Sequence, residues 1–220
     1  MKKKLIIVGT GLFPEVARSY FNEFSNYEVI GFACHQQHKQ GDTIYGLPLY
    51  AIEDLKDTYP PEQVTLFVGI GYKQMNKIRQ RVYEELKSIG YGFATFVYPG
   101  VKIWCSTTLG ENVFIFEDNT IQPFTTIGNN TILWSGNHFG HHGNIGSHCF
   151  ITSHVVISGY CNIKDNVFIG VNATLRDGLT ISSETLIGAG AIIMKSSKPK
   201  EVYLPESTKV FSKNSEQIGF

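Results

Sequence analysis

Histidine is concentrated in one short part of this chain, and its side chain suits two kinds of chemistry. The cluster consists of His138, His141, His142, His148 and His154. A neutral imidazole can remove a proton near neutral pH, and it is also a common ligand of Zn²⁺. A metal site needs three or four converging ligands, whereas a general base needs one histidine beside its substrate. The choice depends on the elements that position these residues.

An apolar residue recurs at every sixth position through the segment that contains the histidines. The series has no gap and consists of Ile103, Leu109, Ile115, Ile121, Ile127, Leu133, Phe139, Ile145, Ile151, Ile157, Ile163, Ile169, Leu175, Ile181, Ile187 and Ile193. Six residues are too few for a pair of helices but suit one short strand and one turn. The sequence therefore predicts a β-solenoid whose interior is lined by this series.

The fourth position of each hexad is typical of a tight corner. Its residues are Asn112, Asp118, Phe124, Asn130, Gly136, His142, His148, His154, Tyr160, Asn166, Asn172, Gly178, Glu184 and Gly190. Residue types that tolerate a positive φ dominate this set, and the residue that follows is mostly small. We therefore expect the chain to turn at the fourth position.

Hexads such as Ile127-Gly-Asn-Asn-Thr and Ile145-Gly-Ser-His-Cys resemble those of the hexapeptide acyltransferases. The resemblance implies a left-handed parallel β-helix with three hexads in each coil. Successive fourth positions then lie at three different corners, so His142, His148 and His154 cannot converge within one chain. We interpret each of them as a turn residue, and a metal site formed between chains stays open as an alternative.

His141 occupies a third position, to which the turn explanation does not apply. Residues eighteen apart stack on adjacent coils, about 4.8 Å from each other, so Gly159 lies beside His141. A glycine there leaves an open slot and an unshielded backbone N–H, as a general base next to an oxyanion donor requires. The family motif His-x-x-x-Ile-Gly, which matches residues 141–146, implies the same role for His141, and the family glycine of the next coil matches Gly159.

Two neighbouring histidines are further candidates. The family often has glutamate where this chain has His142, so we include His142 with His141 and Gly159 among the catalytic residues. What orients His141 is left open. His138 points outward three residues before His141, and it is a candidate to contact the substrate or to orient the base.

The first part of the chain is typical of a small α/β domain. We expect strands at residues 5–8, 27–33 and 64–68 and helices at residues 14–24, 51–56 and 73–88. A tight turn at Gly9-Thr10-Gly11 gives a Rossmann-like opening, but the third glycine and the acidic residue of a dinucleotide site are missing. We expect a Rossmann-like domain at residues 1–96, a β-helix at residues 97–195 and a C-terminal cap or tail at residues 196–220.

Over nearly its whole length the chain resembles bacterial sugar acetyltransferases, which include sialic acid O-acetyltransferases and N-acetyltransferases of nucleotide-linked amino sugars. Besides the hexads, the resemblance rests on Ile6-Ile-Val-Gly-Thr-Gly, Tyr45-Gly-Leu-Pro, Val68-Gly-Ile-Gly and Phe96-Val-Tyr-Pro. It implies a homotrimer that transfers an acetyl group from acetyl-CoA, its co-substrate, to an amino or hydroxyl group of a sugar used in glycan or surface polysaccharide synthesis.

The same resemblance assigns the two substrates to different parts of the chain. The small domain would hold the nucleotide of the sugar around Gly9, Thr10 and Gly11. Acetyl-CoA would lie along the later coils, where Gly188, Ala189 and Gly190 let the backbone approach its pantetheine closely.

The predicted outer faces of the solenoid carry several large aromatic residues, namely Phe114, Phe116, Trp134 and Phe168. An exposed apolar patch usually marks an interface between proteins. We therefore expect these residues to form the contact between the subunits of the trimer.

Composition excludes some other classes of function. Lys plus Arg and Asp plus Glu both number 19 among 220 residues, so no nucleic acid or membrane partner is expected. No apolar run approaches the roughly 20 residues of a membrane span, and no signal-peptide cleavage pattern follows the start, which favours a cytoplasmic location. The four cysteines lack metal-site spacing, so we expect unpaired thiols and no metal cofactor.

Two other functions stay open at the level of the sequence. One is a metal-dependent enzyme like the γ-class carbonic anhydrases, and the other is a non-catalytic trimeric scaffold. The sequence also leaves open the identity of the sugar, its nucleotide and the acyl group, and the choice between an amine and a hydroxyl acceptor.

Overall fold

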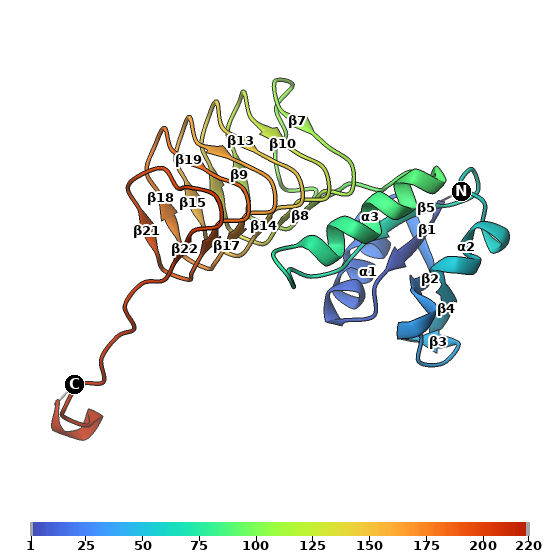
Figure 1. The fold of residues 1–220 in the computed structure, drawn as a ribbon, viewed down its shortest axis with the longest axis horizontal. Helices are drawn as coiled ribbons and strands as arrows, with labels where there is room; N and C mark the ends of the chain where they lie inside the picture. The colour runs from blue at the N-terminus through green and yellow to red at the C-terminus, as the bar shows by residue number, and fades with distance from the viewer. Residues whose placement is uncertain (1, 219–220) are drawn as a thin grey trace.

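A computed structural model describes residues 2–218 and shows two domains side by side (Figure 1). The first is an α/β domain, and the second is a solenoid of stacked coils. The chain that follows the solenoid leaves the body of the molecule as an extended segment. No helix among residues 2–218 is both long enough and apolar enough to span a bilayer.

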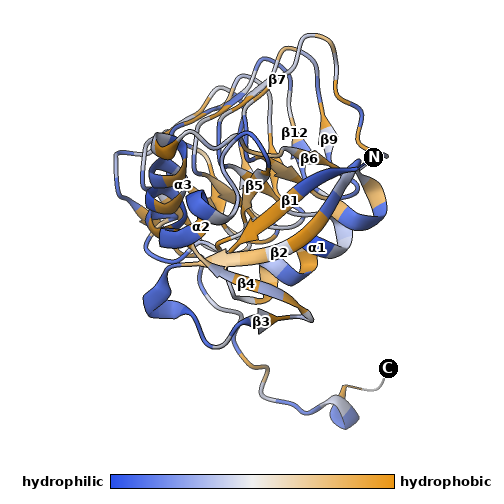
Figure 2. Ribbon diagram, turned by 90° about the vertical axis from the view of Figure 1, so that its right-hand side faces the viewer, coloured by the Kyte–Doolittle hydropathy of each residue, from blue (hydrophilic) through white to orange (hydrophobic). Residues whose placement is uncertain are grey.

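The α/β domain is a five-stranded sheet in the order β3-β4-β2-β1-β5, with helices packed against it. Its elements are β1 (Lys3–Val8), α1 (Leu12–Phe24), β2 (Tyr27–Cys34), the 3₁₀ turn η1 (Gln36–His38), β3 (Thr43–Ile44), β4 (Leu47–Ala51), α2 (Ile52–Thr58), β5 (Thr65–Val68) and α3 (Lys77–Ile89). All pairs of strands are parallel except β3 with β4. β1 is an interior strand, paired with β2 and β5, and its residues 5–8 are apolar and fully buried (Figure 2).

Each strand and helix predicted for this domain is present, with shifted bounds. The largest shift is at the start of α3, which begins at Lys77 rather than at residue 73. Gln74, Met75 and Asn76 have positive φ values, which no α-helix accommodates, so the helix starts after them.

The second domain is a parallel β-helix of two-residue strands. These strands are β6 (Phe96–Val97), β7 (Thr108–Leu109), β8 (Phe114–Ile115), β9 (Thr120–Ile121), β10 (Thr126–Ile127), β11 (Ile132–Leu133), β12 (His138–Phe139), β13 (Asn144–Ile145), β14 (Phe150–Ile151), β15 (Val156–Ile157), β16 (Asn162–Ile163), β17 (Phe168–Ile169), β18 (Thr174–Leu175), β19 (Thr180–Ile181), β20 (Leu186–Ile187), β21 (Ile192–Ile193) and β22 (Val202–Tyr203). Strands pair in parallel with those one coil away, as Ile127 does with Ile145, so each coil contains three hexads.

Three sheets therefore form the three faces of the solenoid. We name them the β7 face (β7, β10, β13, β16, β19), the β8 face (β6, β8, β11, β14, β17, β20, β22) and the β9 face (β9, β12, β15, β18, β21). Each corner joins two faces and lies opposite the third face. This arrangement decides which side chains can meet within one chain.

The predictions about the hexad are confirmed. Every residue that we expected at a corner has a positive φ, from 52° at His142 to 76° at Gly136. From Ile115 to Ile193 the inward apolar series is at most 3% exposed. Cys149 and Cys161 fill two of the small inward positions that follow a corner, and they are buried thiols.

The prediction of an exposed aromatic patch is wrong. Phe114 and Phe116 are 0% and 1% exposed, because the α/β domain covers the β8 face. Phe13 of α1 packs edge-on to Phe114, with ring centroids 5.7 Å apart. Tyr72 packs against Phe168 with the rings tilted and the centroids 4.9 Å apart. These aromatic residues bury apolar surface between the two domains of one chain.

Trp134 also belongs to this interdomain contact. Its indole stacks on Phe116 at 4.5 Å and lies 6.0 Å from Phe13. The apolar area removed from water at this contact favours a fixed arrangement of the two domains, at roughly 25 cal/mol per Å².

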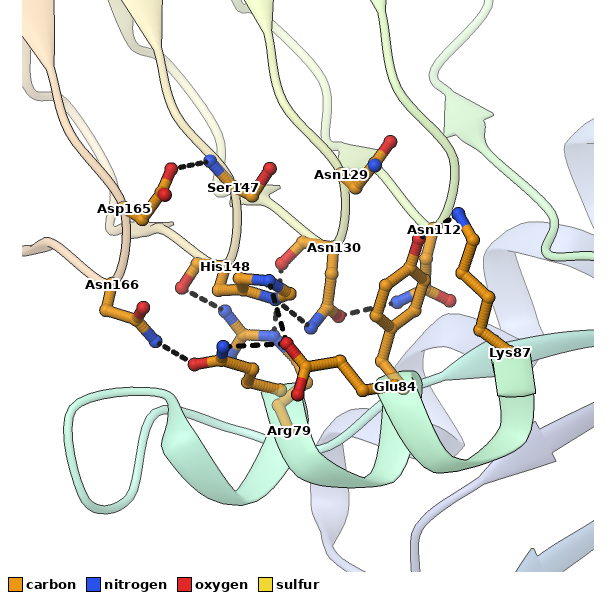
Figure 3. Close-up of polar contacts among 12 residues, drawn as sticks. Arg79, Glu84, Lys87, Asn112, Asn129, Asn130, Ser147, His148, Asp165 and Asn166 are labelled. Carbon is orange, nitrogen blue, oxygen red and sulfur yellow. Dashed lines mark hydrogen bonds and ion pairs between the residues drawn. The ribbon is translucent and has the colours of Figure 1, made fainter.

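A polar joint runs beside this apolar contact, where α3 lies along one corner of the solenoid (Figure 3). We call this corner the α3 corner; it consists of Asn112, Asn130, His148, Asn166 and Glu184. Arg79 of α3 is fully buried, and its guanidinium donates to the carbonyl oxygens of His148 and Cys149 at 3.0 Å and of Asn130 at 3.3 Å. It also donates to the carbonyls of Ile70 and Gly71 in the loop after β5. Backbone carbonyls thus satisfy a buried charge that contacts no carboxylate within residues 2–218.

Burial shifts the pKa values of two basic side chains in the joint. Desolvation lowers the pKa of Arg79 to about 9, which still leaves the side chain charged at neutral pH. Desolvation also lowers the pKa of His148, although the Glu84 carboxylate 3.9 Å away opposes this effect. The His148 ring bonds to the side chain of Asn130 at 2.9 Å and packs against Tyr83. His148 is therefore a turn residue, as predicted, and also part of the contact between the domains.

The segment after β21 begins as a cap on the solenoid. β22 pairs with β20, and the buried Ser197 hydroxyl accepts a hydrogen bond from the N–H of Ser182 at 2.8 Å. From residue 204 to residue 218 the chain is exposed and ends in the 3₁₀ turn η2 (Ser215–Gln217). The expected cap or tail is thus a short cap followed by an extended tail.

Candidate active site

His141 lies between β12 and β13, one residue before the corner at His142. Its backbone N–H donates to the side-chain oxygen of Gln122 at 2.9 Å, and its carbonyl oxygen accepts from the N–H of Tyr160 at 2.9 Å. The backbone is therefore held from the coil before and from the coil after. The imidazole itself is exposed and open to a substrate.

The ring of His141 rests against Gly159 of the next coil. A Cβ atom added to Gly159 would lie 3.0 Å from Cε1 and Nε2 of His141, so any larger residue would displace the ring. Within residues 2–218 the N–H of Gly159 makes no hydrogen bond. A free N–H beside an imidazole can stabilise an oxyanion while the ring accepts a proton.

His142 lies in a stack of rings at its corner. We call this corner the His142 corner; it consists of Phe124, His142, Tyr160 and Gly178, and it joins the β9 and β7 faces. The His142 ring is 4.8 Å from that of Phe124 and 5.1 Å from that of Tyr160. Its Nδ1 lies 3.1 Å from Nδ1 of His141.

Sequence reasoning missed three residues that hold this site. Gln122 binds the backbone of His141, while Phe124 and Tyr160 enclose His142. A signal for the last two was present: both are aromatic residues at fourth positions, one coil before and one coil after His142, where small or polar residues are usual.

The other histidines of the cluster lie elsewhere. His138 is half-buried on the outer side of the β9 face, and no hydrogen bond links it to His141 within the described chain. His148 lies in the joint at the α3 corner, and His154 lies at the third corner, against Gly136. The three corner histidines do not converge, as predicted. Among residues 2–218 no three side chains of His, Cys, Asp and Glu group together around a metal-sized space.

The Gly9-Thr10-Gly11 turn links β1 to α1. Gly9 has a φ of 132°, and a Cβ there would lie 3.0 Å from Pro14, so both backbone and space require glycine. In the part of the chain that the structure describes, no side chain caps α1, so the N–H groups of its first turn keep their capacity to bind an anion. Tyr45 donates to the carbonyl of Gly11 at 3.1 Å and steadies the turn.

This turn and His141 lie on opposite sides of the solenoid. The α/β domain packs on the β8 face, which is the face opposite the His142 corner. The structure of one chain therefore does not bring Gly9, Thr10 and Gly11 together with His141 and Gly159.

The candidate residues for acetyl-CoA lie at the corner that includes His154, more than two coils beyond His142. Gly188 is buried, and a Cβ there would lie 3.0 Å from Leu204 and from the carbonyl oxygen of Tyr203. Its small size is thus explained by contact with the chain's own cap. Ala189 and Gly190 are exposed, and Gly190 has a φ of 73° with open space beside it.

Comparison with known proteins agrees with this architecture. Residues 4–86 match the model of the PglD N-terminal domain. No curated protein sequence matches the chain. Among solved structures, the acetyltransferase domain of PglB from Neisseria gonorrhoeae has a TM-score of 0.79 at 20% identity, over 91% of this chain and 96% of that one.

Two further structures are similar over comparable lengths. PerB from Caulobacter crescentus, solved with CoA and GDP-perosamine, has a TM-score of 0.78 at 21% identity, over 91% of each chain. WeeI from Acinetobacter baumannii has a TM-score of 0.75 at 17% identity, over 92% of this chain and 94% of that one. The fold predicted from the sequence, an α/β Rossmann-like domain followed by a left-handed parallel β-helix, is thereby confirmed, and the match to the PglD N-terminal domain model lies within the first domain.

Proposed function

We propose that this protein transfers the acetyl group of acetyl-CoA to an amino group, or alternatively a hydroxyl group, of a nucleotide-linked sugar. The observation that carries the proposal is the His141 imidazole resting against Gly159, whose N–H makes no hydrogen bond within residues 2–218. Structures of similar fold support the substrates, since PerB was solved with CoA and GDP-perosamine and PglB with acetyl coenzyme A. Synthesis of surface polysaccharide or another glycan is the role that follows.

The proposed reaction is a direct transfer with His141 as general base. Nε2 of His141 takes the proton of the attacking amine or hydroxyl as that group forms a bond to the thioester carbon. The N–H of Gly159 donates to the carbonyl oxygen, on which negative charge develops. The carbon–sulfur bond then breaks, and the imidazolium returns the proton to the leaving thiolate. No covalent enzyme intermediate is needed.

The acceptor would be held by the start of α1. A sugar nucleotide carries a negatively charged diphosphate, which the free N–H groups after Gly9-Thr10-Gly11 suit. The proposal does not specify which nucleotide the sugar carries, because the end of β2 has His35 in place of an acidic residue. That histidine contacts Glu53 at 3.3 Å and Glu85 at 3.2 Å.

We also propose a homotrimer, and the separation of these two regions supports the presence of more than one copy. Within one chain the acceptor turn and His141 lie on opposite sides of the solenoid, so a complete site requires residues from a second copy. The outward residues of the β9 face include the exposed Val156 and Ile192, which suit burial against such a copy. His138 on the same face would then lie beside the shared site.

Acetyl-CoA would lie between neighbouring solenoids, along the exposed backbone at Ala189 and Gly190. Gly188 would contribute only indirectly, through the cap that packs on it. The cysteines support a reducing, cytoplasmic location, because Cys34, Cys105, Cys149 and Cys161 are free thiols.

The proposal is tested by a thermal-shift screen followed by an assay of free CoA thiol. Acetyl-CoA binds the folded state and should raise the melting temperature, by an amount that grows with ligand concentration. A panel of UDP-, GDP- and dTDP-linked amino sugars, with matched hydroxyl sugars, then identifies the acceptor by release of CoA. Absence of stabilisation by acetyl-CoA, together with absence of thiol release with every acceptor, would overturn the proposal.

A further inference from the structure

The His142 corner carries bulky rings in a backbone conformation that disfavours them. Phe124, His142 and Tyr160 have φ values of 60°, 52° and 58°. Large side chains are disfavoured in this region of backbone conformation, and such strain concentrates at functional sites. Phe124 and Tyr160 are also 59% and 60% exposed, so burial in their own chain does not compensate the strain.

The rings hold His142 in one orientation. The planes of His142 and Tyr160 differ by 15°, and those of His142 and Phe124 by 29°, so the imidazole is enclosed from both sides. Tyr160 also meets the ring of His141 edge-on, with the planes at 88° and the centroids 5.1 Å apart. Both histidine rings are thus fixed by the same tyrosine.

The contact between the two histidines determines where their protons lie. Nδ1 of His141 and Nδ1 of His142 are 3.1 Å apart, so one of them donates a hydrogen and the other accepts it. A general base needs a free lone pair at the nitrogen that faces the substrate. Nε2 of His141 is the nitrogen next to Gly159. If Nε2 carries the free lone pair, the proton of the neutral His141 ring must be on Nδ1, where it points to His142.

We propose that His142 is a positioning residue that fixes the tautomer of His141 through a neutral imidazole instead of a carboxylate. The inference rests on the proposed function in that it takes Nε2 of His141 as the base. His142 accepts the Nδ1–H of His141 and carries its own proton on Nε2. The stack of Phe124 and Tyr160 keeps the acceptor nitrogen in place.

The first experiment needs no substrate. Nitrogen NMR of the full-length protein labelled with ¹⁵N-histidine reports the tautomer of each neutral ring. We expect His141 to be fixed with its proton on Nδ1, and we expect His142→Phe, which keeps the stack but has no ring nitrogen, to release it into a mixture of tautomers. His154→Phe is the matched control, because it changes a corner histidine away from the site. A proton on Nε2 of His141, or an unchanged tautomer in His142→Phe, would overturn the proposal.

The second experiment measures turnover. His142→Phe should lower kcat about tenfold or more, with the KM of both substrates nearly unchanged, because a misplaced proton blocks the base without affecting binding. His142→Glu restores a strong acceptor and should recover turnover, with the acid limb of the pH profile moved to higher pH. His142 and Tyr160 are the titratable groups in contact with the His141 ring. Wild-type turnover in His142→Phe would overturn the positioning role.

The two experiments separate this inference from the proposed function. Suppose that the His141 tautomer is fixed and that His142→Phe releases it, but the protein transfers no acetyl group. This result would overturn the proposed function and would still support the contact between the two histidines. If the protein transfers acetyl groups but the His141 tautomer does not change in His142→Phe, the proposed function would stand and the positioning role of His142 would be overturned.

Discussion

The proposed chemistry of His141 depends on the lack of a side chain at Gly159. Gly159 lets the imidazole lie where a Cβ would come within 3.0 Å of it, and the same glycine offers its N–H. Gln122 and Tyr160 hold the backbone of His141 from two sides. The base is therefore positioned by main-chain contacts between coils, which give it a fixed place on an exposed corner.

Replacement of His141 by alanine should lower turnover about a hundredfold or more, in line with the usual contribution of a positioned base, and leave the affinity for acetyl-CoA nearly unchanged. Gly159→Ala should also lower turnover, because its methyl group displaces the ring. Steady-state kinetics together with calorimetric binding of acetyl-CoA check both variants. His154→Ala serves as the control, and near-normal turnover in His141→Ala would contradict the mechanism.

At the scale of elements, the start of α1 is the part of the α/β domain best suited to bind an anion. Gly11 at its N-cap has open space around the position of a Cβ and no positive φ, so side chains fit there. Aspartate at an N-cap stabilises a helix, yet its charge repels a diphosphate.

Gly11→Asp should therefore raise the KM for the sugar nucleotide at least several-fold while the protein stays folded. Gly11→Ser, which caps the helix without a charge, is the matched control and should remain close to wild type. Acceptor titrations at fixed acetyl-CoA measure the difference. Equal KM values in the two variants would contradict binding of the diphosphate at this turn.

The joint between α3 and the solenoid gives a prediction about pH. Burial lowers the pKa of His148 in the folded state below its unfolded value of about 6.5. Between these two pKa values the unfolded chain binds more protons, so this group contributes a loss of stability as the pH falls below about 6.5. His148→Asn keeps a residue that accepts the corner conformation and does not titrate.

We expect the free energy of unfolding to fall less between pH 7.5 and pH 5.5 in His148→Asn than in the wild type. Urea denaturation at the two pH values measures it. His154→Asn, at an exposed corner, should keep the wild-type dependence. If His148→Asn also kept the wild-type pH dependence, the His148 ring would not be neutral and buried in the folded protein.

At the scale of the whole molecule, the separation of the acceptor turn from His141 predicts that each site is built from two chains. His141→Ala retains a sound acceptor turn, and Gly11→Asp retains a sound base. In trimers refolded from an equal mixture, about a quarter of the sites combine the two sound halves.

At acceptor concentrations well below KM, trimers refolded from the mixture should therefore be more active than the same two variants combined without exchange of chains, because only mixed trimers contain sites with both a sound base and a sound acceptor turn. Light scattering should give the mass of three chains for the active species. Equal activity of the verified mixed trimers and the unexchanged mixture would contradict a site shared between two chains.

The sequence alone determined most of the solenoid, because its stabilising contacts repeat. Each corner needs a positive φ and each inward position needs an apolar side chain, so residues such as Asn112, Gly136 and Ile151 reveal their places by spacing. The position of His141 beside Gly159 followed from the same repeat. For the α/β domain, apolar runs and turn glycines were enough to predict β1, β2, β5 and the three helices, but β3 and β4 were not predicted.

Only the tertiary structure decided how the two domains meet. An apolar outer face is equally suited to a second subunit or to another domain of the same chain, so Phe114 and Phe116 were assigned to the wrong contact. His142 and His148 have the same residue type at the same hexad position, yet one is exposed in a stack of rings and the other is buried under α3. That difference depends on contacts such as Arg79 with the carbonyl of His148, which join residues 69 positions apart. No local pattern encodes such a contact, because each partner is compatible with many others until the domains pack.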